Sequence, residues 1–369
     1  MTTTINNKHK KLNVPNLRFK EFQGEWSVTS LQKDCIVNPT NEKIADKFVY
    51  VDLESVKQGQ LYKYQILTKE NAPSRAQRVL HTDDILFQCV RPYQMNNYMV
   101  KETMSDIQWV ASTGYAQIRT QTDYPAFLYY VLNTSKYNKA VMVRCTGSSY
   151  PAINSEDLSK IPFYKCGIAE QKKIADFLSL LDERIATQNK IIDKLQSLIK
   201  GIADKLFQTA RTTKPLLEFA PNITSGTDKS GSGTIPLYGS TGIIGTVKNA
   251  SQKGNIVLVA RVGTIGTVQY VNEPCGVSDN ALIVEAGEMT KYIYHFLKTY
   301  NFTRITSGTT QPLITASSLK KAAIPTYDIE SQTRIVLCLN GLEKKLDMAK
   351  QYLSDIAVMK RYLLRQMFI

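Results

Sequence analysis

Two stretches of the chain place apolar residues at the spacing of a coiled-coil seam. Between residues 170 and 208, apolar side chains occupy two positions of a seven-residue repeat, and a glutamine is the one polar residue among them. Residues 330 to 369 carry the same stripe, with Lys360 as its polar exception. The pattern predicts two long helices with core positions Ile174, Leu178, Leu181, Ile185, Gln188, Ile192, Leu195, Ile199, Ile202, Ile335, Leu339, Leu342, Leu346, Leu353, Ile356 and Leu363.

The length of these helices suggests that they pack on each other. About 39 residues in a helix extend about 58 Å, which is hard to bury inside one compact domain. We therefore expect an antiparallel pair in which Gln188 fixes the register. A third apolar column makes the faces broader than one partner helix can cover; it consists of Phe177, Ile191, Leu198, Cys338, Tyr352 and Met359.

The second stripe belongs to a long internal repeat. The segment GSSYPAI at 147 to 153 returns as GTTQPLI at 308 to 314, and the same offset continues without a gap to the end of the chain. A period this long corresponds to a whole domain followed by a helix, far beyond the repeat length of solenoids. The chain is therefore predicted to contain two copies of one module, related by a pseudo-twofold axis.

The segments before each long helix mix short β-rich runs with single helices. FVYVDL, DDILFQCV and GYAQIR precede a predicted helix at PAFLYYVLN, while GNIVLVARV, TVQYV and NALIVEA precede one at TKYIYHFLKTY. Each unit is therefore predicted to be α+β. The expected boundaries are a first domain at 1 to 168 with an N-terminal segment at 1 to 24, a helix at 169 to 209, a second domain at 210 to 328, and a helix at 329 to 369.

The charge of the chain favours a polyanionic partner. The net charge of +14 divides into +6 for residues 1 to 169, +1 for 170 to 208, +4 for 209 to 329 and +3 for 330 to 369. This spread indicates basic faces on folded units, which suit nucleic acid, although a basic surface that serves only solubility stays open. No apolar run is long enough to span a bilayer and the start is polar, so a cytoplasmic, nucleoid-associated protein without a membrane partner is expected.

The motifs of catalysis and cofactor binding are missing from the sequence. The glycine-rich stretch at 238 to 268 lacks the spacing of a dinucleotide or phosphate-binding loop, so its glycines are interpreted as turns and bulges. Six cysteines lie far apart, and His81 and His295 belong to no cluster, so neither zinc nor disulfides are expected. A methyltransferase is disfavoured because no N/D-P-P-aromatic motif for a flipped base is present. No catalytic residue, metal site or bound cofactor is predicted.

Four motifs along the chain form a recognisable set. They are VPNLRFKEFQGEW at the start, the G-x-x-x-P-x-I loop followed by L-x-K-I-P and A-E-Q-x-x-I-A, R-V-G-T-I-G-T-V in the second unit, and S-D-N-A after it. Together these motifs resemble the specificity subunit of type I restriction-modification systems. The second copy departs from the first where A-E-Q becomes E-S-Q and where the Ile-Pro pair lies two residues later, at Ile324 and Pro325. The resemblance covers nearly the whole chain.

The resemblance implies a function and a set of partners. Such subunits hold two target recognition domains on two long helices and read a split sequence in double-stranded DNA, one half per domain. Two methylation subunits would bind the helical region and supply S-adenosylmethionine for adenine methylation. Two restriction subunits would use ATP and Mg for DNA translocation. The alternative is a coiled-coil assembly protein that binds nucleic acid nonspecifically.

Residue types at loops suggest which side chains contact DNA, because Arg, Asn and Gln pair with guanine and adenine edges. In the first unit the candidates are Arg91, Tyr93, Gln94, Asn96, Asn97, Tyr98, Ser148, Ser149 and Tyr150. In the second unit they are Lys248, Asn249, Arg261, Thr264, Asn280, Thr309, Thr310 and Gln311. A polar turn or a cap is an alternative role for the two loop triplets, and an ion pair is one for Arg261.

Overall fold

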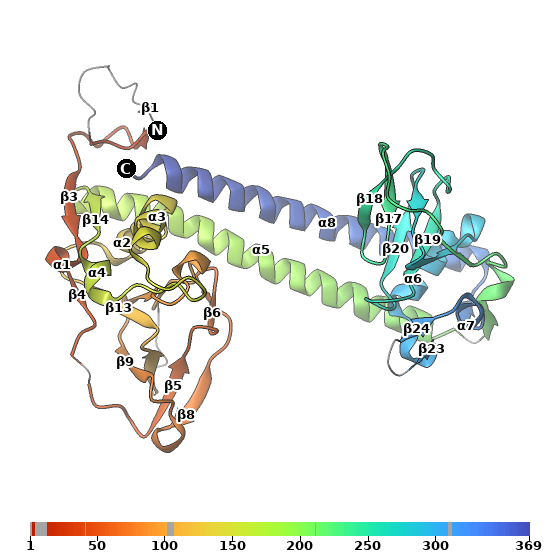
Figure 1. Cartoon of the computed structure of the whole chain (residues 1–369), viewed down its shortest axis with the longest axis horizontal. Coiled ribbons are helices and arrows are strands. Elements are labelled where there is room, and N and C mark those ends of the chain that lie inside the picture. The colour runs from red at the N-terminus through yellow and green to blue at the C-terminus, as the bar shows by residue number, and fades with distance from the viewer. Residues whose placement is uncertain (1, 4–12, 41, 102–106, 211, 309–311) are drawn as a thin grey trace. The chain divides into compact units, whose positions relative to one another are not determined.

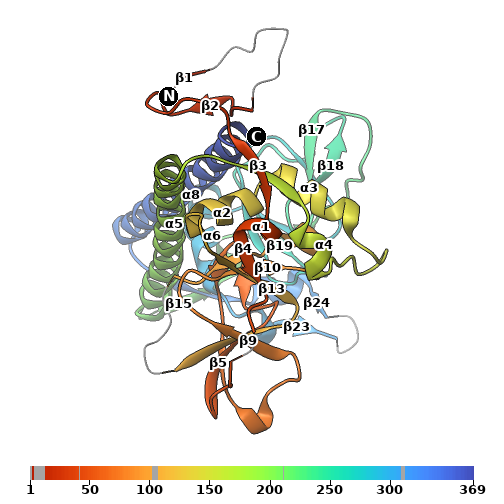
Figure 2. The same cartoon turned by 90° about the vertical axis from the view of Figure 1, so that its left-hand side faces the viewer.

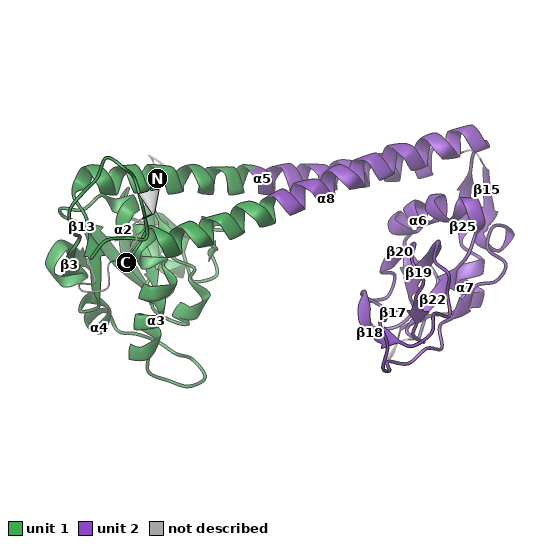
Figure 3. Ribbon diagram, turned by 90° about the horizontal axis from the view of Figure 1, so that it is seen from above, with its two compact units in different colours: residues 1–187, 353–369 green, residues 188–352 purple. Residues whose placement is uncertain are grey.

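The chain folds into two compact units that share two long helices. The computed structural model describes all residues except 1, 4–12, 41, 102–106, 211 and 309–311. Unit 1 comprises residues 1–187 and 353–369, and unit 2 comprises residues 188–352 (Figure 3). Helices α5 (Ile168–Gln208) and α8 (Ile329–Gln366) each begin in one unit and end in the other (Figure 1). Within the described part of the chain, no helix is long and apolar enough to cross a membrane.

Unit 1 contains two four-stranded sheets. The first has the order β11 (Tyr98–Met99), β10 (Ile85–Gln88), β13 (Tyr115–Thr120), β4 (Cys35–Val37) and is antiparallel throughout. The second has the order β8 (Gln65–Thr68), β5 (Lys47–Val51), β12 (Gln108–Ser112), β9 (Ala76–Leu80), with β5 and β12 parallel. Helix α2 (Pro125–Leu132), which is apolar all round, lies against β10 and β13 (Figure 2). The smaller elements are β1 (Thr2–Thr3), β2 (Leu17–Arg18), β3 (Ser27–Ser30), α1 (Leu31–Asp34), β6 (Val56–Lys57), β7 (Gln60–Leu61), α3 (Ser135–Arg144), α4 (Ser155–Ser159) and β14 (Pro162–Lys165).

Unit 2 repeats this plan with a four-stranded and a three-stranded sheet. Its larger sheet has the order β16 (Thr224–Ser225), β22 (Ala281–Val284), β19 (Ile256–Ala260), β20 (Val268–Val271) and is covered by α6 (Thr290–Thr299). Its smaller sheet has the order β18 (Ile243–Val247), β17 (Ile235–Tyr238), β21 (Gly276–Val277), with β17 and β21 parallel, as β5 and β12 are in unit 1. The other elements are β15 (Thr212–Pro215), β23 (Thr306–Ser307), β24 (Leu313–Ile314), α7 (Ala316–Lys320) and β25 (Ala323–Thr326). The α+β prediction for both units is confirmed.

The offset between the two sequence copies is also the offset in structure. Helices α5 and α8 begin at Ile168 and Ile329, and strands β14 and β25 begin at Pro162 and Ala323. The displaced Ile-Pro pair of the second copy therefore does not shift the start of its helix. The first turn of both helices is also held alike, because the Gln171 Nε2 donates to the Cys166 carbonyl at 2.9 Å and the Gln332 Nε2 donates to the Tyr327 carbonyl at 2.7 Å.

The long helices run antiparallel within each unit. In unit 2, Gln188 is only 9% exposed, and its Nε2 donates to the Ala349 carbonyl at 3.0 Å. In unit 1, the other polar exception, Lys360, forms an ion pair with Asp182. All sixteen predicted core positions are buried or half-buried. Each polar residue in the apolar stripes, Gln188 or Lys360, therefore bonds to a partner on the other long helix.

The end of each long helix inserts an aromatic residue into a globular core. Phe207, at the end of α5, lies with its ring 5.5 Å from the rings of both Tyr292 and Phe296 in unit 2. Phe368, which follows α8, lies 5.5 Å from Phe127 in unit 1. These two phenylalanines occupy the same position in the two copies of the sequence, so the repeat places equivalent side chains in equivalent cores.

Candidate nucleic-acid interface

In unit 1 the two loops that carry the predicted DNA contacts meet in space. The Arg91 backbone N–H donates to the Pro151 carbonyl at 2.8 Å, and the Ile153 N–H donates to the Cys89 carbonyl at 3.0 Å. The Arg91 guanidinium lies over the Tyr150 ring, 4.5 Å from its centroid. The structure therefore joins residues 91–96 and 148–150 into one surface, although strands β11 to β13 and helices α2 and α3 separate them along the chain.

The first of these loops has an unusual backbone that is held by buried amides. A single turn at Pro92–Gln94 is flanked by Arg91 and Met95, both in the left-handed region with φ of 55° and 52°. The Gln88 side chain donates to the Val90 carbonyl and to Gln94 Oε1, each at 2.8 Å. Non-glycine residues with positive φ cost energy and persist only where surrounding contacts enforce them.

The structure corrects one member of the predicted set. Asn97 is only 1% exposed: its Oδ1 accepts from the Gln88 N–H at 2.8 Å, and its Nδ2 donates to Asn133 Oδ1 at 3.2 Å. A side chain that is buried and satisfied on both sides supports the loop and does not reach a base edge. Asn96 is half-buried and accepts from the Gln58 N–H at 3.1 Å, and Tyr98 is half-buried in β11. The exposed members of the set are Tyr93, Gln94, Ser148, Ser149 and Tyr150.

In unit 2 the corresponding surface surrounds Arg261. The Arg261 N–H donates to the Asn280 carbonyl, and the Ile314 N–H donates to the Arg261 carbonyl, both at 3.0 Å. Thr264 and Asn280 are exposed beside it. Thr309, Thr310 and Gln311 lie outside the described residues. Lys248 and Asn249 are exposed but follow β18 in the smaller sheet, whereas Arg261 follows β19 in the larger one.

The two surfaces share a backbone framework. Gly147 and Gly308 are equivalent in the repeat and adopt φ of 88° and 89°, a conformation that favours glycine. In unit 1 the Ile153 N–H donates to the carbonyl of Cys89, the residue that follows β10, at 3.0 Å. In unit 2 the Ile314 N–H donates to the carbonyl of Arg261, the residue that follows β19, also at 3.0 Å. The next residue after each isoleucine, Asn154 or Thr315, caps a short helix with its side chain. This shared framework explains why the G-x-x-x-P-x-I segment occurs twice.

Arg78 is a candidate that the sequence analysis missed. Its Nε is buried without a hydrogen-bond acceptor among the described residues, and the same is true of the Arg261 Nε in unit 2. Burial lowers the pKa of Arg78, and the nearby Cys89 thiol acts in the opposite direction. Cys89 occupies in unit 1 the position of Arg261 in unit 2, so both units place a half-buried arginine with a buried Nε near the same backbone position. An arginine within a strand carries no sequence signal for this role.

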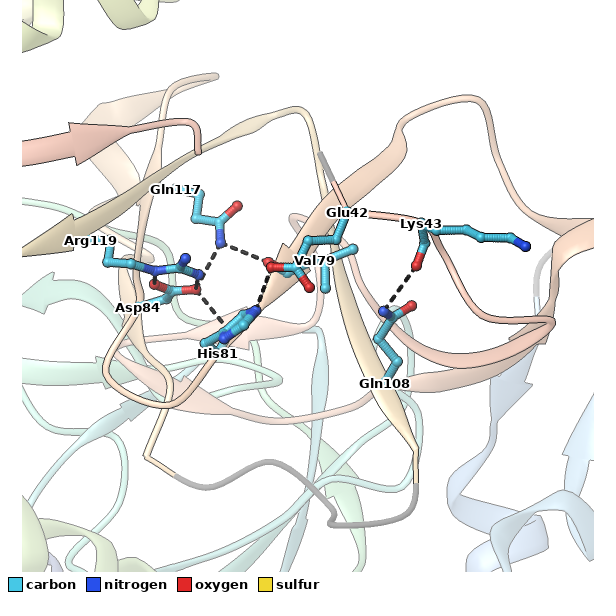
Figure 4. Close-up of polar contacts among 8 residues, drawn as sticks. All are labelled: Glu42, Lys43, Val79, His81, Asp84, Gln108, Gln117 and Arg119. Atoms are coloured by element: carbon cyan, nitrogen blue, oxygen red, sulfur yellow. Dashed lines mark hydrogen bonds and ion pairs between the residues drawn. The ribbon is translucent and has the colours of Figure 1, made fainter. Parts of the chain in front are cut away.

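Asp84 and His81 in unit 1 bond to other side chains of the same unit. Asp84 is fully buried and accepts from Arg119 Nε and Nη2, each at 2.8 Å, and from Gln117 Nε2 at 2.7 Å (Figure 4). His81 is exposed and its Nε2 lies 2.7 Å from Glu42 Oε1. Asp84 directly precedes β10, so its buried carboxylate joins the start of β10 to β13 and is not exposed to a ligand.

His295 in unit 2 has a structural environment too. It is buried, and its Nε2 lies 2.9 Å from Asn340 Oδ1. Burial lowers the pKa of His295. Throughout the residues that the structure describes, no group of three or more His, Cys, Asp or Glu side chains is placed to hold a metal ion.

Comparison with known proteins gives the family of the chain. The family model described as "Type I restriction modification DNA specificity domain" matches twice, at residues 37–197 and 213–357. No curated protein matches. The chain is similar in fold to the type I restriction-modification S subunit from M. genitalium, with 18% identity, a TM-score of 0.67, and coverage of 96% of this chain and 99% of that one.

A second similar structure comes from a study of complex assembly and conformational transition in a type I R-M system. It has 19% identity and a TM-score of 0.58, and the match covers 92% of this chain and 96% of that chain. A DNA-specificity family does not favour an assembly protein that binds nucleic acid nonspecifically. The chain belongs to the type I restriction modification DNA specificity family, as a component that recognises DNA and does not itself catalyse a reaction.

Proposed function

We propose that this chain reads a split target in double-stranded DNA, with one half-site for each unit. The observation that carries the proposal is the repeated loop framework, in which Gly147 and Gly308 adopt the same backbone conformation beside exposed polar side chains. Polar side chains on such loops can reach base edges in the major groove, while basic residues hold phosphates and fix orientation. The two half-sites would be separated by an unspecified spacer, set by the two helices that continue from one unit into the other.

The long helices are proposed to bind two methylation subunits. Both helices expose large apolar side chains at the third column of their stripes: Ile191 and Leu198 on α5, and Tyr352 and Met359 on α8. Exposed apolar patches of this kind favour protein partners. The methylation subunits would bind S-adenosylmethionine and methylate adenine in each half-site. Two restriction subunits with ATP and Mg would complete the assembly.

An exchange of segments tests the proposal. The chain is assembled with its methylation subunits, and methylated adenines are mapped by sequencing DNA exposed to the complex. We expect a split motif, of which one half changes when residues 25 to 150 are replaced by those of a relative with another target, and the other half when residues 215 to 310 are replaced. A continuous motif, or a replacement that changes both halves, would contradict the proposal.

A further inference from the structure

The position of Arg91 differs between the two units in a way that points to function. Cys89 in unit 1 and Arg261 in unit 2 occupy equivalent positions, because the carbonyl of each accepts the N–H of the equivalent isoleucine. Two residues after these positions lie Arg91 and Gly263, which are therefore equivalent too. Both are in the left-handed region, with φ of 55° for Arg91 and 68° for Gly263. Glycine adopts this conformation freely and arginine does not. Unit 1 therefore keeps a large cationic side chain at a position where the backbone favours glycine.

The Arg91 side chain is oriented by an aromatic ring, with its hydrogen-bonding edge left open. The Tyr150 ring, which is 64% exposed, lies 4.5 Å from the guanidinium. The ring contact restrains the guanidinium through its cationic carbon and uses none of its N–H donors. Among the described residues no carboxylate pairs with Arg91, in contrast to Arg18 and Arg119 of the same unit. The donor edge is thus available to a ligand.

Several hydrogen bonds hold the loop that carries Arg91. Gln88 bonds to Val90 and Gln94, and its Oε1 accepts from the Asn96 N–H at 3.2 Å. The Arg91 N–H donates to the Pro151 carbonyl, so the two loops are joined through their backbones. A preoriented fork of parallel N–H donors matches the O6 and N7 acceptors of guanine in the major groove. A fixed donor pair of this kind loses little entropy on binding, which favours base readout.

We infer that Arg91, held against the Tyr150 ring, is a specificity-determining residue of unit 1 that reads one guanine in the first half-site. This inference rests on the proposed function. Unit 2, with Gly263 at the equivalent position, reads its half-site without such a fork. The other role for an arginine here, a contact with a backbone phosphate, depends on charge alone and would carry no base preference.

Three substitutions in the full chain, assembled with methylation subunits, separate these roles. R91G installs the residue of unit 2 and suits the backbone conformation, so it should fold at least as well as the native chain. R91K keeps the charge but replaces the planar fork of parallel donors by one ammonium nitrogen, which lacks that preset geometry. R144K is the matched control, because Arg144 is an exposed arginine of the same unit that donates to its own helix at the Ala140 carbonyl.

The readouts are the methylated motif and the affinity for duplexes that carry each base pair at each specified position. We expect R91K and R91G to lose the preference for one G·C pair in a single half-site, with affinity for the native target reduced about 5- to 150-fold, the range for a lost bidentate base contact. R144K should leave motif and affinity unchanged. At Tyr150, Y150F should retain the preference and Y150L should weaken it.

The outcomes distinguish this inference from the proposed function. A split motif that stays fully specified in both R91K and R91G would overturn the guanine-reading role. A loss of affinity in R91G that is equal for all sequences, together with an unchanged motif in R91K, would overturn it as well, because that pattern indicates a phosphate contact. A change in both half-sites would overturn it too. The absence of any split motif for the native chain would instead contradict the proposed function.

Discussion

A buried ion pair joins the N-terminal segment of unit 1 to the first turn of α5, and its removal gives a sharp test of how that helix is anchored. The Arg18 Nε and Nη2 lie 2.7 and 2.8 Å from the two oxygens of Glu170, with the side chains only 9% and 5% exposed. Arg18 also donates to the Gly24 carbonyl at 2.6 Å and the Gln23 carbonyl at 3.0 Å. The hydrogen bond from Arg18 to Glu170 raises the pKa of Arg18, so the guanidinium stays charged.

Replacing Glu170 by Gln leaves that charge buried without its counter-ion. Breaking a buried pair in this way costs about 3 to 5 kcal/mol. For a unit of roughly 200 residues, a loss of about 3 kcal/mol lowers the thermal midpoint by about 6 to 12 °C. The measurement is thermal unfolding of E170Q followed by circular dichroism and tryptophan fluorescence, since Trp26 lies in the core of unit 1.

The same two segments offer a matched control. Glu21 and Lys173 also form an ion pair between the N-terminal segment and α5, but their side chains are 47% and 49% exposed. An exposed pair is screened by solvent and contributes little to stability, so E21Q should leave the midpoint nearly unchanged. The double variant R18M/E170L should recover most of the stability, because apolar residues of similar volume remove both charges. Equal effects of E170Q and E21Q would refute the reasoning, since burial would then make no difference.

Three further predictions follow from single positions. Alanine at Gly147 or Gly308 should destabilise its unit by about 1 to 2 kcal/mol, because both residues adopt positive φ; a thermal midpoint equal to that of the native chain would contradict this. In H295Q the thermal midpoint of unit 2 should become less sensitive to acid, because burial lowers the pKa of His295 in the folded state below its unfolded value. The stabilising contribution of His295 is complete above about pH 6.5 and is lost as the pH falls toward the folded pKa. Parallel plots of midpoint against pH for H295Q and the native chain would argue against this. The Q188L variant should be more stable by about 1 kcal/mol, because leucine burial outweighs one hydrogen bond to the Ala349 carbonyl; a loss in urea unfolding would show that this bond matters more than burial.

The surface proposed to bind DNA was only partly predictable from the sequence. The residue types expected to contact bases led to Arg91, Gln94 and Tyr150, and these three residues lie on one surface in unit 1. The same reasoning selected Asn97, which is buried, and passed over Arg78, whose Nε is buried without an acceptor among the described residues. An asparagine that supports a loop and one that faces a base have the same local sequence context, because the direction of the side chain is set by neighbours distant in the chain.

The sequence by itself determined the two long helices, their apolar faces and the repeat of the whole plan. Helix periodicity is a local property, since side chains three and four positions apart share a face, and a duplicated pattern that spans a domain and its helix indicates duplicated structure. Only the tertiary structure decided that residues 91–96 and 148–150 form one surface, and that Arg91 adopts the backbone conformation of Gly263. Those features depend on hydrogen bonds between segments far apart in the chain. Such bonds do not produce a periodic pattern of residues, so they cannot be recognised from the sequence.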